Sequence, residues 1–566
     1  MPSHPKGLAV LYLTEVWERF SFYGLKALLV LYLNSGVLSS SRFSDVFGSS
    51  VVITLFGQPQ SQLEVQALSS QLNELYAGAA YITPLLGGMI ADSLTGSRAA
   101  LLSGGVLMAA GHGCMAVERS FLVGLLLLAL GNGLFKPTVS STLARLYEPR
   151  ALAPLRDRGF AIFYTGINIG ALMAPLVCGS LQQAVGYDAG FSAAGVGMLI
   201  GLACYIGGER HLPSEDLGAA RGCRWRLVGG HHAAHRGGEE TRELERLELL
   251  STPRCAGDDR PVEEREAHRI DAELEAHQLE SLGCGTASSA RHIDHSSQNG
   301  RGDCNGCDGL NGPNGRDDGN GHRGQVPRSR LAGGLASDTL RATAALVLLC
   351  TLVIPFWVAY EQLSNTVPLY FRDVVDRSFG GKQLPAASLQ SFNPLFSVLM
   401  MPALTTLWTR QAQRGNEPSP TTKMAIGCLL QGAGWLLLAV GSRTASSAAD
   451  SKMPLALPLL STFLLTCGQL YLAPIGLALV SGCCSARARS SAIGIWFMAG
   501  GVAGLIAGPI GTLYSYWSPP AFFSLLCGLC VANGCLIYTV APRLVRMAQV
   551  LAGSQSGEAK RDGGGQ

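Results

Sequence analysis

Residues 8–33 read LAVLYLTEVWERFSFYGLKALLVLYL, an apolar stretch with charged side chains inside it. The four charged residues are Glu15, Glu18, Arg19 and Lys26. A membrane span that started after them would have only about nine residues, whereas a bilayer needs about 20. The charges therefore lie at membrane depth, where an unpaired one costs about 2.5 kcal/mol or more and where such residues commonly mark an ion or substrate pathway.

The polar side chains of this span share one side of a helix. At helical spacing one face carries Glu15, Arg19, Phe22 and Lys26, with Glu18 and Tyr23 beside it. We expect this face to look into a watery cavity.

The composition indicates an all-α membrane protein with several spans. Of 566 residues, 48% are apolar and only 15% are charged, against about 25% charged in soluble proteins. The net charge of +3 is too small to indicate a nucleic-acid partner. The chain has no GxxxxGK[ST], GxSxG or HExxH motif, so we expect neither an enzyme nor an ATP-driven pump, and no cofactor.

Apolar runs long enough to span the bilayer come in two groups of six. They lie at about 8–33, 72–92, 98–117, 121–145, 158–181 and 189–208, and at about 340–371, 390–409, 423–442, 454–481, 490–513 and 519–541. We therefore expect one six-helix bundle in 1–208, a second in 339–545, and a disordered tail in 546–566.

The segment 209–338 between the two groups is rich in Gly, Arg, Asp, Glu and His. Such a composition does not bury enough apolar surface to order itself, so we expect a largely disordered linker, whose partner nothing in its sequence indicates. Its isolated pair Cys304 and Cys307 and the histidines 231, 232 and 235 lack a second ligand pair at zinc-site spacing, so we expect no metal.

Short loops rich in arginine and lysine predict the orientation. Such loops follow the fourth, eighth and tenth spans, and they all fall on one side. The positive-inside rule places these loops, both termini and the linker in the cytoplasm. Twelve helices in two halves of six, joined by a cytoplasmic linker, are typical of a transporter of the major facilitator type.

Five ordered motifs then carry a specific resemblance. Residues 15–24 (EVWERFSFYG) closely resemble the ExxERFxYYG signature of the proton-dependent oligopeptide transporter family, also called POT, PTR or NPF. The other four motifs, which resemble the family's GGxxAD, GxGxFKP, FYxxINxG and FWxxxEQ patterns, are residues 87–92, 131–137, 163–170 and 356–362. The resemblance covers both halves and excludes the linker.

The resemblance implies proton-driven transport of di- and tripeptides by alternating access. It implies a proton-coupling set, which consists of Glu15, Glu18, Arg19, Lys136 and Glu361. It also implies a substrate-binding set, in which Lys26 and Lys136 face the peptide and the other members are Tyr23, Tyr76, Asn168, Asn393 and Trp496. A purely structural set of ion pairs is the alternative for the charged triplet, but buried pairs stabilise a fold little on balance.

One departure keeps the substrate open. In the tenth span the family's peptide transporters usually carry a glutamate that answers the peptide ammonium, whereas residues 468–476 here read GQLYLAPIG, with Gln469 in its place. Gln469 accepts a hydrogen bond without neutralising a cation, and a charge-assisted bond is worth about 1.5–3 kcal/mol.

Three functions remain open on this evidence. The first is a proton-coupled peptide symporter in a lipid bilayer, with small peptides and protons as its partners. The second is a proton-coupled transporter of nitrate or another small anion, which Gln469 favours. The third is a non-transporting receptor that signals through the linker, for which deletion of about 213–335 would abolish the phenotype.

Overall fold

The computed structural model describes residues 4–149, 152, 155–213, 341, 343–446, 452–483 and 489–562. The predicted linker, 209–338, lies outside these residues except for its first five, and so do its cysteine pair and its histidines. Contacts divide the chain into two compact units. The first comprises Met1–Ala234, Arg341–Thr406 and Pro418–Gln566, and in the described part of the chain the second consists of Leu407–Glu417.

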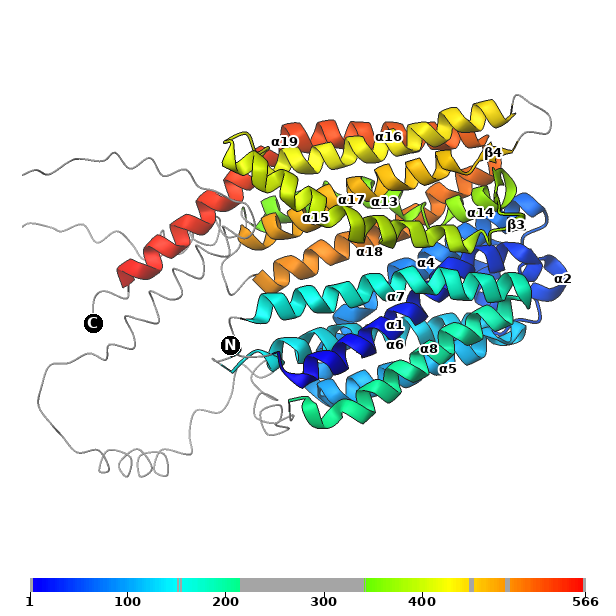
Figure 1. The fold of residues 1–566 in the computed structure, drawn as a ribbon, viewed down its shortest axis with the longest axis horizontal. Helices are drawn as coiled ribbons and strands as arrows, with labels where there is room; N and C mark the ends of the chain where they lie inside the picture. Colours follow the sequence, from blue (N-terminus) through cyan, green and yellow to red (C-terminus); the bar gives the residue numbers. More distant parts are fainter. Residues whose placement is uncertain are drawn as a thin grey trace, which may run out of the picture. The chain divides into compact units, whose positions relative to one another are not determined.

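The N-terminal half consists of long helices joined by short turns. The helices are α1 (Lys6–Tyr32), α4 (Gln62–Ile90), α5 (Ser97–Met115), α6 (Phe121–Leu146), α7 (Arg156–Ala184) and α8 (Tyr187–Gly208). Short π-helical segments follow α1 and α4, namely η1 (Leu33–Val37) and η2 (Ala91–Thr95), and the 3-10 segments are η3 (Glu118–Ser120) and η5 (Glu209–His211). Two short helices, α2 (Ser40–Phe43) and α3 (Ser49–Phe56), follow η1. Helix α1 packs on α7 and α8, while α6 packs on α4 and α5 (Figure 1).

The C-terminal half begins with a broken helix. Residues 343–351 are helical and lead into α13 (Ile354–Glu361) and α14 (Thr366–Asp373), which are separated by a turn. The remaining helices are η6 (Ala387–Ser391), α15 (Phe392–Gln413), α16 (Pro420–Ser446), α17 (Ala456–Gly482), α18 (Arg489–Tyr516) and α19 (Pro519–Asp562). Helix α16 packs on α17 and α19, and α13 packs on α18 and α19.

The helices match the predicted spans in position. In the described residues, nine helical segments are long and apolar enough to cross a membrane. The other three predicted spans coincide with α4, α5 and α15, whose 29, 19 and 22 residues fit the length that a bilayer requires. The membrane-protein class is confirmed, and the number of twelve spans stays a prediction.

Short strands and loop helices gather at one end of the helices, which we call the strand end. Here β1 (Val375–Asp376) pairs in parallel with β4 (Met453–Pro454), and β2 (Ser378–Phe379) pairs with β3 (Lys382–Gln383) antiparallel. Helix α2 lies at the same end (Figure 1). Gly36, with a φ of 107° that favours glycine, turns the chain out of α1 at this end.

Motif glycines let the helices of the N-terminal half approach closely. A Cβ on Gly87 in α4 would lie 2.0 Å from the carbonyl oxygen of Gly133 in α6, and a Cβ on Gly170 in α7 would lie 2.4 Å from that of Val16 in α1. Both approaches exclude any larger residue. The motifs that carry the resemblance therefore position α4, α6 and α7 beside the charged stretch of α1.

The ends of α15 and α19 remain to be described. In the second unit, the end of α15 closes with Gly415 at a φ of 68° and a bond from its N–H to the carbonyl of Ala412. Helix α19 continues to Asp562. The disorder expected for the tail 546–566 stays a prediction.

The adjacent glycines 87 and 88 give a matched test of the α4–α6 contact. Gly87→Ala should destabilise the protein by about 1–3 kcal/mol, because the added methyl meets backbone that has no room to move. Gly88→Ala should be nearly neutral, since its Cβ would lie 3.6 Å from Pro137. Thermal unfolding midpoints in detergent compare the two, and equal midpoints would contradict the packing described.

Candidate functional site

The charged triplet of α1 forms a buried ion-pair cluster. Arg19 donates from Nη2 to Glu18 Oε1 at 2.6 Å and from Nε to the other oxygen of Glu18. The same Nε lies 3.2 Å from Glu15 Oε1. Glu15, Glu18 and Arg19 are 4%, 0% and 4% exposed. One guanidinium thus serves two carboxylates, and Glu15 Oε2 has no hydrogen-bond partner among the described residues.

Lys136 in α6 supplies the positive charge that the triplet lacks. Its Nζ lies 5.2 Å from the centre of the Tyr81 ring. In the described part of the chain it has no carboxylate within 4.0 Å, although it interacts electrostatically with all three triplet residues. The cluster of Glu15, Glu18, Arg19 and Lys136 therefore contains two anions and two cations, with Lys136 held at a distance.

A second buried ion pair joins the two halves. Lys26 lies about two helical turns beyond Arg19 in α1. Its Nζ lies 2.8 Å from Glu361 Oε2 at the end of α13. The two side chains are 14% and 4% exposed. Ser364, in the turn that follows α13, donates to the same oxygen at 3.5 Å. The break in this helix thus places Glu361 opposite α1.

Other contacts between the halves lie near the same ion pair, toward the strand end. Asn365 Nδ2 donates to Ser70 Oγ in α4 at 2.7 Å. Ser391 Oγ and Gln390 Nε2, at the end of η6, donate to the carbonyls of Leu172 at 2.8 Å and Ala27 at 3.2 Å. Since α4 also packs along α18, the halves are joined tightly in this region.

A neutral hydrogen-bond chain occupies the C-terminal half. Tyr360, which precedes Glu361 in the sequence, donates its hydroxyl to Gln469 Oε1 in α17 at 2.6 Å. Asn393 in α15 donates from Nδ2 to the Tyr360 oxygen at 2.9 Å and lies 3.0 Å from Thr466 Oγ1. Tyr360 therefore brings together Gln469 and Asn393, two residues considered above for substrate binding.

The remaining predicted binding residues are spread over three places. The rings of Tyr23 and Tyr76 both lie near the Phe22 ring, with ring centres 5.3 and 6.4 Å from it. Asn168 in α7 donates to the carbonyl of Tyr164 in its own helix. Trp496 is 4% exposed and covers Gly476, where a Cβ would meet its ring at 2.1 Å. The structure therefore places Trp496 in the packing of α17 on α18.

Three residues of this region were absent from the predicted set. Tyr360 and Tyr81 are polar aromatic residues inside or near motifs, and only their tertiary partners distinguish them. Glu74 in α4 is 0% exposed and interacts electrostatically with Lys26 and Glu361. Its position within a predicted span was the available signal, because a carboxylate at membrane depth is by default a functional candidate.

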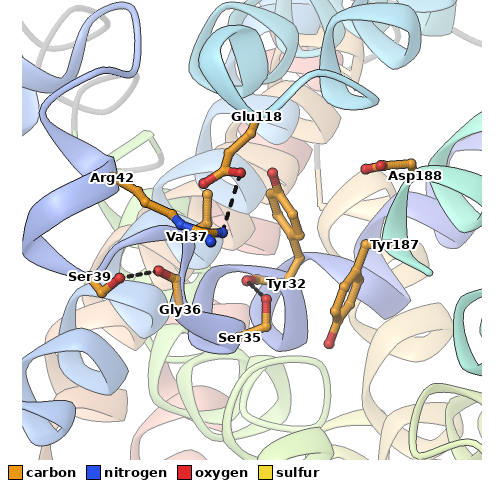
Figure 2. A pocket seen from close by; sticks show the side chains of 9 residues that line it. All are labelled: Tyr32, Ser35, Gly36, Val37, Ser39, Arg42, Glu118, Tyr187 and Asp188. Carbon is orange, nitrogen blue, oxygen red and sulfur yellow. Dashed lines mark hydrogen bonds and ion pairs between the residues drawn. The ribbon is translucent and has the colours of Figure 1, made fainter.

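A pocket of about 520 Å³ lies apart from these groups. Figure 2 shows its lining at the end of α1, with Tyr32 and Tyr187 facing it and Arg42 directed toward Glu118 at 3.8 Å. None of its nine lining residues belongs to the predicted site. In the described residues no group of three His, Cys, Asp or Glu side chains is arranged to hold a metal.

A family model described as "POT family" matches residues 88–219 and 334–522, more than half of the chain. The chain belongs to the POT family. The match leaves out 220–333, most of the predicted linker, and it begins after the motif at 15–24. It includes the motifs at 131–137, 163–170 and 356–362, and all but the first residue of the motif at 87–92. Since the family consists of transporters, the family assignment agrees with a multi-pass membrane protein.

Several named proteins are similar to this POT-family chain. The peptide transporter YePEPT of Yersinia enterocolitica subsp. palearctica is 28% identical over 515 residues, which cover 90% of this chain and 88% of that protein. A di-/tripeptide transporter of Lactococcus lactis subsp. lactis is 26% identical, with 96% of both chains covered.

Solved structures confirm the major facilitator type of fold. A crystal structure of a peptide transporter POT in complex with sulfate has a TM-score of 0.64, 23% identity and coverage of 96% of both chains. The POT family transporter PepTSo has a TM-score of 0.65 and 19% identity, with 96% of this chain and 99% of that one covered.

The buried pair of Lys26 and Glu361 can be tested by a double-mutant cycle. Lys26→Met alone and Glu361→Leu alone should each destabilise this POT-family protein by about 3–5 kcal/mol, because each leaves one buried charge without a partner. The double variant should recover much of that loss. Thermal midpoints in detergent measure the coupling.

The pair of Arg42 and Glu118 provides the control, since its side chains are 71% and 42% exposed. The same cycle there should give about 0–1 kcal/mol. Additive losses at Lys26 and Glu361 would show that the two side chains do not form the pair.

Proposed function

We propose that this protein is a proton-coupled symporter of di- and tripeptides that works by alternating access. Its relatives in Yersinia and Lactococcus, named as peptide and di-/tripeptide transporters, support the substrate class. The observation that carries the mechanism is the buried cluster of two carboxylates, Arg19 and the more distant Lys136. We also propose that both termini and the linker are cytoplasmic, as the positions of the basic loops predict.

The charge balance of the cluster couples proton and substrate. With both carboxylates ionised, Glu15, Glu18, Arg19 and Lys136 sum to zero. Protonation of Glu15, whose Oε2 has no partner among the described residues, leaves Glu18 paired with Arg19 and the charge of Lys136 uncompensated. A peptide carboxylate then restores neutrality, so that proton and substrate enter together.

The polar chain of Tyr360, Gln469 and Asn393 is the proposed contact for the other end of the peptide. Its oxygen atoms accept hydrogen bonds from an ammonium, but Gln469 already accepts one from Tyr360. Contacts to the two charged ends of a peptide leave its side chains variable. The ion pair of Lys26 and Glu361 holds the two halves together, and it must break when α1 and α13 separate.

A second candidate is a small anion such as nitrate. The neutral side chain of Gln469 favours it, since an anion brings no ammonium to be compensated. Lys136 serves either substrate equally well. The two candidates therefore differ in what the C-terminal half must recognise.

Uptake by reconstituted protein tests the proposal. Purified protein in liposomes should accumulate radiolabelled dialanine under an inward proton gradient, and an uncoupler should abolish the accumulation. Lys136→Ala should reduce uptake strongly. The absence of dialanine uptake by folded protein, together with proton-driven nitrate uptake, would overturn the peptide assignment in favour of the anion.

The tenth-span position gives a sharper test of how the ammonium is held. Gln469→Glu should lower the half-saturation concentration for dialanine several-fold, because a charged acceptor adds about 1 kcal/mol over a neutral one. N-acetyl-dialanine, which has no ammonium, serves as the matched competitor. If Gln469→Glu changed the inhibition of uptake by dialanine and by N-acetyl-dialanine equally, residue 469 would not contact the ammonium.

A further inference from the structure

Glu74 is a buried carboxyl group that the proposed transport mechanism does not use. It lies in α4 with 0% exposure. Its Oε1 accepts a bond of 2.8 Å from the side-chain amide of Asn73. Among the described residues, its Oε2 has no hydrogen-bond partner, and no lysine or arginine nitrogen lies within 4.0 Å of the carboxylate.

Helix α18 covers Glu74 with glycines. We call the contact of Gly501, Gly504, Gly508 and Gly511 in α18 with α4 the glycine seam. A Cβ on Gly508 would lie 3.3 Å from Glu74 Cβ, and one on Gly504 would lie 3.0 Å from the backbone nitrogen of Gly78. The two backbones therefore approach closely, and α18 turns no polar side chain of the seam toward the carboxyl group.

In the described part of the chain, the one cation near Glu74 is already paired with another carboxylate, so it does not compensate an ionised Glu74. The titratable groups that act on it are Lys26 from α1 and Glu361 from α13. In the described residues, α6, which also packs on α4, brings no charge to it. Since Lys26 is already paired with Glu361 at 2.8 Å, an ionised Glu74 would be a second carboxylate sharing one lysine. A buried charge without a partner is strongly unfavourable.

We propose that Glu74 is a proton-controlled gating residue: the seam between α4 and α18 closes only when Glu74 is protonated. On closure the Glu74 carboxylate takes up a proton from water at the strand end, and on opening it returns that proton to the same water. This inference rests on the proposed alternating access. It assigns Glu74 control over the state of the gate, separate from the binding cluster around Lys136.

The gate position can be measured directly as a distance. Leu63 at the start of α4 and Tyr516 at the end of α18 are 50% and 59% exposed, so both tolerate a spin label. Because the chain has 16 cysteines, the labels are attached to p-acetylphenylalanine at these positions. Pulsed electron resonance on the full-length protein in nanodiscs, without substrate, then gives distance distributions from pH 5 to 9.

The expected result is a short distance at low pH that gives way to a longer one as pH rises. Glu74→Gln should keep the short distance at every pH, since the amide is a neutral mimic of the protonated acid. Asp45→Asn, an exposed acid in the loop after α2, should respond like the unmodified chain. A pH response in Glu74→Gln equal to that of the unmodified chain, or a distance that does not respond to pH at all, would overturn the proposal.

A second variant keeps the test informative if Glu74→Gln does not fold. Gly504→Ala places a methyl 3.0–3.1 Å from the Gly78 backbone, so it should increase the long-distance population at every pH while the pH response remains. A Gly504→Ala population identical to that of the unmodified chain would count against the seam. Because the distances need no substrate, loss of the pH response in Glu74→Gln supports the gate even if dialanine uptake fails.

Discussion

A charged side chain in the bilayer must find its partner inside the protein, and the rest of this structure depends on that constraint. Helix α1 carries four charges in its apolar stretch. Arg19 holds Glu15 and Glu18 within its own helix. Lys26 has no such neighbour and reaches Glu361 in the other half of the chain. The ion pair of Lys26 and Glu361 thus joins α1 to the end of α13.

This way of satisfying charge makes the halves interdependent. Buried ion pairs add little stability compared with apolar packing, so stability alone gives a weak account of the pairs of α1. Because each of these charges is paired, a change in the protonation state of one group leaves its partner without compensation. In the proposed mechanism, protonation of Glu15 alters the charge balance at Lys136, and separation of the halves exposes Lys26 and Glu361. That mechanism therefore links binding, protonation and opening through electrostatics.

Sequence reasoning succeeded where local geometry decides the outcome. Helical spacing put Glu15 and Arg19 on one face, and their side chains are indeed paired. The motif glycines Gly87 and Gly170, for which the sequence predicted no packing role, occupy close helix contacts. The all-α membrane fold followed from composition and span length. The roles assigned to individual site residues stay predictions, because neither the geometry nor the relatives' names test them.

Tertiary partners could not be predicted in the same way. Lys26 and Glu361 are separated by 335 positions, and only the break between α13 and α14 brings them together. No sequence pattern indicated that the Tyr360 hydroxyl would hydrogen-bond both Gln469 and Asn393. Glu74 was overlooked because no charged neighbour in sequence or motif drew attention to it, although α18 packs glycine against it. Trp496, which the resemblance assigns to the substrate-binding set, lies in the packing of α17 on α18.

The central claim is that a proton and a peptide cross together because they balance one buried cluster of charges. Liposomes that contain the protein and a trapped pH-sensitive dye, held without a pH gradient and with a potential negative inside, test it most directly. The account predicts that external dialanine triggers acidification of the interior, and that Glu15→Gln removes this acidification while labelled dialanine still exchanges across the membrane. Dialanine entry without any acidification in the unmodified protein would contradict the account.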